Sequence, residues 1–254
     1  MATIMTANAR KTFKLVIEYD GSAFHGWQRQ KNDRTVQETI ETALAVMTRE
    51  PVTLIGSGRT DAGVHALGQA ASFATASRLD ADAFFNGLNS LLPSDVVIRA
   101  CERMPDDFHA RFAVKSKRYR YHILNTSVAP AIGRQFVCHI RKPLDVAAMI
   151  QAAGSLTGVH DFKAFEGSGS PRAHTVRQVT DSTLKDAGNG NLTYDIQANG
   201  FLRFMVRNIV GTLVDVGLGK IRFEEVAAIL QSKDRSRAGA TAPPQGLFLM
   251  EVNY

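Results

Sequence analysis

The chain has 254 residues, of which 44% are apolar, so it can bury a substantial core as one large domain or two small ones. No apolar stretch approaches the roughly 20 residues that span a bilayer, and the polar segment 1–11 lacks the apolar region of a secretory signal. Two cysteines are too few for a disulfide framework, which favours a reducing cytoplasm. The net charge of +6 favours a polyanionic partner and no membrane.

The first half of the chain predicts a mixed α/β arrangement with hairpin-like connections. Strands are expected at 13–19, 52–55, 69–73 and 96–102. A helix is expected to begin after Thr35, because Thr35 and Glu38 form a capping-box pattern before apolar residues at helical spacing. A second helix is expected over 79–91, before Pro93.

The second half alternates in the same way. Strands are expected at 118–124, 135–140, 175–184, 192–198 and 247–252, and helices at 144–156, 204–216 and 224–230. Asp145 lies early in the first of these helices, where the helix dipole favours an acid. The segment 165–171 is expected to be a flexible loop. The simplest division is into two mixed α/β halves, 1–112 and 113–254.

The segment between Phe108 and Leu144 contains no Asp or Glu but carries eight basic residues. A solvated basic face does not explain the missing acids, whereas phosphate neutralisation does, because each Lys or Arg contact releases counterions. Four of these residues are candidate nucleic-acid contacts: Lys115, Lys117, Arg118 and Arg120.

A glycine-rich turn at 56–69 connects two strand-like segments. It contains four glycines, a single carboxylate, Asp61, and a guanidinium two residues before it, Arg59. Glycines allow the backbone to come close to a ligand. Taken alone, an Asp in such a turn more often caps its own loop than performs chemistry.

The string from Arg59 to His65, Arg-Thr-Asp-Ala-Gly-Val-His, closely resembles the catalytic motif of the tRNA pseudouridine synthase A family. Further matches follow in family order at 18–21, 24–30, 106–111, 117–121, 201–211 and 241–247. The resemblance implies an α+β fold: two similar mixed α/β halves whose antiparallel sheets join across a central RNA-binding cleft, with helices packed behind. It also implies a homodimer and tRNA as the partner.

The resemblance implies that uridine is isomerised to pseudouridine at positions 38, 39 and 40 of the tRNA anticodon stem-loop. This reaction breaks the N1–C1′ bond and rejoins uracil through C5 without oxidation, so it requires no cofactor or metal. It does require a carboxylate, and Asp61 is the predicted catalytic residue. The pairs His160–Asp161 and Asp107–His109 lack a third ligand at suitable spacing, so no metal site is predicted.

Three further residues are assigned to the site. Arg59 could pair with Asp61 or reach RNA phosphate, and the resemblance favours the RNA role. By resemblance, Tyr119 stacks on the target base and assists proton transfer, although two tyrosines on one strand face also suit a structural pair. Arg207 lies on a mainly apolar helix, which calls for a buried anion, and is predicted to be the ion-pair partner of Asp61. His65 is expected to be structural.

Two other classes of function fit parts of the sequence. A non-catalytic RNA-binding module explains the basic segment but leaves a carboxylate in a phosphate-binding loop without a purpose. A glycosidase needs two cooperating carboxylates and a nuclease needs an acidic metal cluster, whereas the turn offers one acid.

Overall fold

The computed structural model describes residues 10–169 and 174–254, so the N-terminal segment and the end of the loop expected at 165–171 lie outside the described residues. The described strands are β1 (Lys11–Tyr19), β2 (Ile55–Gly56), β3 (His65–Thr75), β4 (Val96–Met104), β5 (Ser116–Asn125), β6 (Cys138–Ile140), β7 (Gly158–Asp161), β8 (Val176–Asp186), β9 (Asn191–Ala198) and β10 (Leu247–Asn253). The described α-helices are α1 (Val36–Thr48), α2 (Ala81–Leu91), α3 (Val146–Gly154), α4 (Met205–Gly217) and α5 (Glu225–Ser232).

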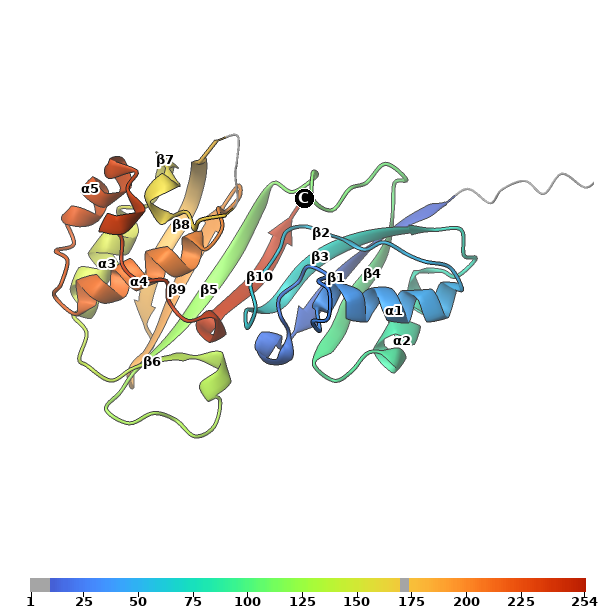
Figure 1. Ribbon diagram of the computed structural model, residues 1–254, viewed down its shortest axis with the longest axis horizontal. Coiled ribbons are helices and arrows are strands. Elements are labelled where there is room, and N and C mark those ends of the chain that lie inside the picture. The colour runs from blue at the N-terminus through green and yellow to red at the C-terminus, as the bar shows by residue number, and fades with distance from the viewer. Residues whose placement is uncertain (1–9, 170–173) are drawn as a thin grey trace, which may run out of the picture.

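All described strands belong to one sheet with the order β4-β1-β3-β10-β5-β9-β8-β7, while β2 pairs with β3 and β6 with β5. The strand β10 lies in the middle of this sheet (Figure 1). It runs antiparallel to β5 but parallel to β3, with Phe248 opposite His65. The two antiparallel sheets expected from the resemblance are joined into one sheet, and the parallel pairs of β10 with β3 and of β6 with β5 make that sheet mixed.

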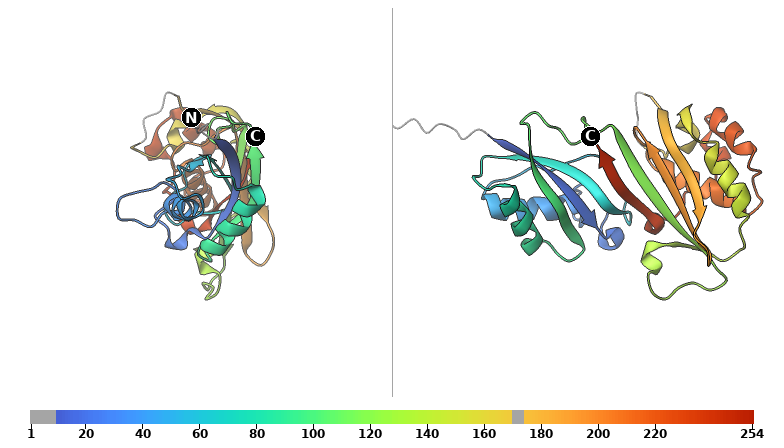
Figure 2. Two further views of the ribbon diagram at one scale, coloured as in Figure 1. Left: turned by 90° about the vertical axis from the view of Figure 1, so that its right-hand side faces the viewer. Right: turned by 180° about the vertical axis from the view of Figure 1, so that it is seen from behind.

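The α-helices gather mainly on one side of the sheet (Figure 2), with α1 and α2 over the first half and α3, α4 and α5 over the second. Alternation along β5 separates its two faces. Tyr119 and Tyr121 are buried and contribute to the hydrophobic core beneath the helices. Arg118 and Arg120 therefore project from the opposite face of the sheet.

The helix starts follow from local sequence. The side chain of Thr35 accepts a hydrogen bond from the backbone of Glu38, as the capping pattern predicts. Asp145 caps α3 through the backbone N–H of Ala148 in the same way. These contacts satisfy backbone donors that have no partner within the helix.

The strands differ from expectation most clearly at three boundaries and in one additional strand. The segment expected as a strand at 52–55 contributes only its end to β2, and β3 begins at His65 rather than at 69. At 135–140 a 3₁₀ turn, Arg134–Phe136, replaces the first half of the expected strand, because Gly133 enters it with a φ of 74°. The short strand β7 was not expected.

Candidate active site

The loop that carries Asp61 connects β2 to β3 and is fixed by backbone hydrogen bonds to the segment before α1. The N–H of Trp27 donates to the carbonyl of Thr60 (3.1 Å), and the N–H of Gly63 donates to that of Phe24 (3.3 Å). At Gly26, where φ is 94°, a Cβ would lie 2.7 Å from the Thr60 carbonyl oxygen. Glycine is needed there because the backbone approaches the loop too closely for a side chain.

Asp61 forms an ion pair with Arg207 of α4. Arg207 Nη1 donates to Asp61 Oδ2 at 3.0 Å, while Arg207 Nε donates to the carbonyl of Ala242 at 2.8 Å. Within the described residues, Asp61 Oδ1 has no hydrogen-bond partner. The side chains of Asp61 and Arg207 are 31% and 14% exposed, so the pair is partly open to solvent rather than fully buried. The arrangement holds one carboxylate oxygen and leaves the other available.

Tyr119 of β5 lies beside this ion pair. Its ring packs edge-on against Phe201, with centroids 5.0 Å apart. Burial raises its pKa, and the nearby Tyr19 and Asp61 raise it further, so the phenol is neutral next to the carboxylate. The described residues provide no hydrogen-bond partner for the Tyr119 hydroxyl.

Two residues near the site were missed in the sequence. The hydroxyl of Tyr19 is 2.7 Å from Thr60 Oγ1, directly before Asp61. Phe204 precedes α4 in the left-handed region, with φ of 59°, and its ring lies 5.1 Å from the guanidinium carbon of Arg207. Such a backbone is uncommon for a bulky residue. Neither periodicity nor capping patterns reveal a positive φ at an aromatic residue.

Arg59 does not pair with Asp61. Its Nε donates to Gln28 Oε1 at 3.0 Å, and the residue is exposed. Of the two roles open from the sequence, the ion pair with Asp61 is absent, and Arg207 takes that place.

The four basic residues predicted to contact RNA occupy different environments. Lys117, on the same face as Tyr119, donates to the carbonyl of Ser57 at 2.8 Å, and Lys115 is exposed. On the other face, Arg120 makes two hydrogen bonds to the buried carboxylate of Asp195, of 2.9 and 3.0 Å. Arg118 Nε is 3.7 Å from the same group. The segment between Phe108 and Leu144 has no acid of its own, and Asp195 of the neighbouring strand β9 neutralises its arginines.

His65 is built into the core. Its Nδ1 accepts a hydrogen bond from the N–H of Gly21, and its ring stacks on Phe248 with centroids 4.7 Å apart. Burial lowers its pKa more than the carboxylate of Asp20 raises it, so the ring is neutral near pH 7. The structural role expected for His65 agrees with these contacts.

The family model described as tRNA pseudouridine synthase matches residues 15–113 and 152–254. The chain belongs to this family. It is 49% identical over 244 residues to the tRNA pseudouridine synthase A of Acetivibrio thermocellus, covering 96% of this chain and 100% of the relative. The tRNA pseudouridine synthase A of Thermoanaerobacter pseudethanolicus is 49% identical over 94% of this chain and 98% of its own length. That of Syntrophotalea carbinolica is 47% identical over 95% of both chains.

Among solved structures, a Cas6 product complex aligns over 96% of this chain and all of its own, with 14% identity and a TM-score of 0.18, which is too low to support a shared fold. In this member of the synthase family, residues 10–169 and 174–254 contain no group of three His, Cys, Asp or Glu side chains that could hold a metal. No helix in the same part of the chain is long and apolar enough to cross a membrane.

Proposed function

We propose that this protein converts uridine to pseudouridine at positions 38, 39 and 40 of the tRNA anticodon stem-loop, with Asp61 as its catalytic residue. The proposal rests on the hydrogen bonding of the Asp61 carboxylate. Arg207 holds one oxygen, and the other has no partner among the described residues. A fixed carboxylate with a free oxygen suits a nucleophile or base that acts on a bound nucleotide.

Tyr119 supplies the second part of the site. Its neutral hydroxyl and its ring lie next to Asp61, where the ring can stack on uracil once the nucleotide has left the RNA stack. After uracil rejoins the ribose through C5, the C5 proton must be removed. We assign this relay to the Tyr119 hydroxyl, which takes up the C5 proton while passing its own to Asp61. Arg207 keeps the carboxylate in position during these steps.

RNA binding is assigned to the helix side of the sheet, over the seam where β10 joins the two halves. Arg59, Lys115 and Lys117 are the proposed phosphate contacts on this side. Arg118 and Arg120 project from the other face and are engaged by Asp195, so their geometry favours a structural role. The family resemblance supports a homodimer that needs no cofactor, and light scattering of the purified protein tests the dimer.

Tritium release from C5-labelled uridine in tRNA tests the proposed reaction. An isomerase displaces the C5 hydrogen while the RNA strand stays intact, a non-catalytic RNA-binding module releases no tritium, and a nuclease cuts the strand. Mapping pseudouridine in tRNA from cells that lack the protein tests the three positions. Retention of pseudouridine at all three positions in those cells would contradict the assignment.

A further inference from the structure

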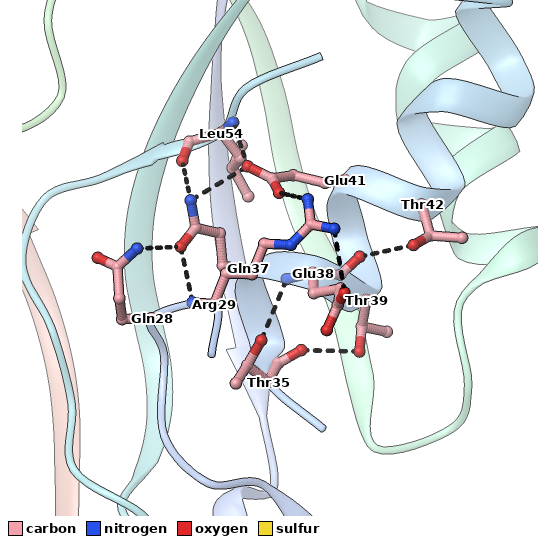
Figure 3. A network of polar contacts seen from close by, with 9 residues as sticks. All are labelled: Gln28, Arg29, Thr35, Gln37, Glu38, Thr39, Glu41, Thr42 and Leu54. Carbon is pink, nitrogen blue, oxygen red and sulfur yellow. Dashed lines mark hydrogen bonds and ion pairs between the residues drawn. The ribbon is translucent and has the colours of Figure 1, made fainter. Parts of the chain in front are cut away.

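A buried glutamine on α1, Gln37, connects this helix to the segment before it and to Leu54, which lies just before β2 (Figure 3). Gln37 is 8% exposed, and its amide makes four hydrogen bonds. Its Nε2 donates to Glu41 Oε1 (3.1 Å) and to the carbonyl of Leu54 (3.0 Å). Its Oε1 accepts from Gln28 Nε2 (2.8 Å) and from the N–H of Arg29 (3.0 Å). Both donors and both acceptor sites of the amide are used.

The direction of these hydrogen bonds is set by Glu41. A carboxylate and a backbone carbonyl only accept hydrogen bonds, so the Gln37 NH₂ group must face Glu41 and Leu54. Glu41 Oε1 is itself held by the N–H of Leu54 at 2.9 Å. The Gln37 oxygen must then face Gln28, which turns the NH₂ group of Gln28 inward and its oxygen outward.

The outward oxygen of Gln28 accepts the hydrogen bond from Arg59 Nε at 3.0 Å. The orientation set by Glu41 is thus passed through Gln37 to Gln28, whose oxygen faces the Arg59 guanidinium. The two Nη groups of Arg59 have no hydrogen-bond or ion-pair partner within the described residues. Arg59 is thus held by its Nε, with both amino groups exposed, two residues before Asp61.

We propose that Gln28, oriented by Gln37 and Glu41, is a positioning residue that presents Arg59 to an RNA phosphate beside Asp61. The inference rests on the proposed RNA role of Arg59. A free arginine loses much rotamer freedom when it binds, and a side chain already held at Nε loses less. The network acts on tRNA affinity through Arg59 and has no contact with the reacting atoms.

A double-mutant cycle on the full-length protein tests this coupling. Gln28→Leu, Arg59→Ala and the double variant are compared by tRNA dissociation constant at one salt concentration. We expect about a tenfold loss of affinity for Arg59→Ala and about threefold for Gln28→Leu, because hydrogen bonds to charged groups are the stronger ones. The double variant should bind as Arg59→Ala does. Gln30→Leu is the matched control, since the Gln30 amide donates to the carbonyl of His25 and should leave affinity unchanged.

The direction of the network is tested by Glu41→Gln, which replaces an obligatory acceptor with an amide that can also donate. We expect about a threefold loss of affinity that disappears in the Arg59→Ala background. Glu38→Gln is the matched control on the same helix, because Glu38 and Glu41 both pair with Arg29 but only Glu41 accepts a hydrogen bond from Gln37. Melting temperatures are measured throughout.

The outcomes separate the two claims. If Arg59→Ala weakens binding but the losses from Gln28→Leu and Glu41→Gln persist undiminished in that background, the positioning role is wrong while the RNA role of Arg59 stands. If Arg59→Ala leaves affinity and turnover unchanged, the RNA role fails and the inference fails with it.

Discussion

Arg207 reaches Asp61 across 146 positions of sequence and donates to its Oδ2 at 3.0 Å. Asp61 is fixed by the loop between β2 and β3, whereas Arg207 lies on α4 over the other half of the sheet. The ion pair therefore exists only when both parts of the chain are folded and joined. Variants of Asp61 test the chemistry of the catalytic loop. Variants of Arg207 test how the second half of the chain holds that loop's carboxylate.

Asp61→Asn should abolish turnover while leaving tRNA affinity within about twofold, and the melting temperature should fall less than in Arg207→Ala because the amide oxygen can still accept the hydrogen bond from Arg207. The amide keeps the shape of the side chain but not the charge that the chemistry uses. Tritium release under multiple turnover measures the first effect, and equilibrium binding the second. Turnover by purified Asp61→Asn protein, free of wild-type enzyme, would remove Asp61 from the catalytic role.

Arg207→Ala should lower activity and reduce the free energy of unfolding by about 1–3 kcal/mol. The loss is smaller than the roughly 3–5 kcal/mol of a fully buried pair, because the Asp61 side chain is 31% exposed and solvent screens the unpaired charge. Arg207→Lys should recover part of the stability but little activity, since one ammonium cannot reproduce the bonds to both Asp61 and Ala242. Urea denaturation and tritium release check both variants. Wild-type values for Arg207→Ala would show that the pair has neither role.

Tyr119→Phe should slow single-turnover chemistry while tRNA affinity and melting temperature hold. The ring remains, and the hydroxyl has no partner among the described residues whose loss would destabilise the fold. Tyr119→Leu removes the ring and should lose affinity as well, because base–aromatic stacking contributes ~1–3 kcal/mol. A purely structural tyrosine predicts instead that both variants lose melting temperature together with activity.

Stability should fall steeply at alkaline pH. Burial raises the pKa of all five tyrosines: Tyr19, Tyr119, Tyr121, Tyr194 and Tyr254. The folded protein holds these protons more tightly than the unfolded chain, so their stabilisation is complete below the unfolded pKa of about 10 and is lost as pH rises above it. Urea denaturation at increasing pH measures the loss, and phenolate absorbance should rise only as the fold is lost. Full phenolate absorbance in the folded state would contradict this.

Basic residues on the two faces of β5 should have different effects on the salt dependence of tRNA binding. Replacing Lys115 and Lys117 with Gln should reduce the magnitude of the log–log salt slope by about 0.7–0.9 per lost phosphate contact. Replacing Arg118 and Arg120 with Gln should leave the slope unchanged but cost about 3–5 kcal/mol of stability, since Asp195 would be a buried, unpaired charge. The reverse pattern would place RNA on the opposite face of the sheet.

Local patterns predicted the helix starts because capping depends on residues within one turn. Thr35 and Asp145 each bond a backbone N–H three residues later. The pairing of Arg207 with an acid followed from a related argument, because a guanidinium on an apolar helix face requires an anion. The resemblance of the Asp61 turn then identified which anion to expect.

The contacts that were not predicted depend on strand neighbours far apart in sequence. Asp195 neutralises Arg120 because β9 lies beside β5 in register, which the composition of the 108–144 segment cannot reveal. The parallel pairing of β10 with β3 is of the same kind. The positive φ of Phe204 is set by tertiary packing, since the ring lies against Gly167, where a Cβ would be 2.4 Å from Phe204 Cδ2.

The position of β10 has a consequence for biosynthesis. During translation, β3 and β5 emerge well before the strand that pairs with both of them. The nascent chain therefore exposes unpaired strand edges in its middle, which are natural sites for chaperone binding and for aggregation. Until β10 has left the ribosome, the sheet is not continuous between the half that carries Asp61 and the half that carries Arg207, so we expect the active site to be assembled only at the end of synthesis.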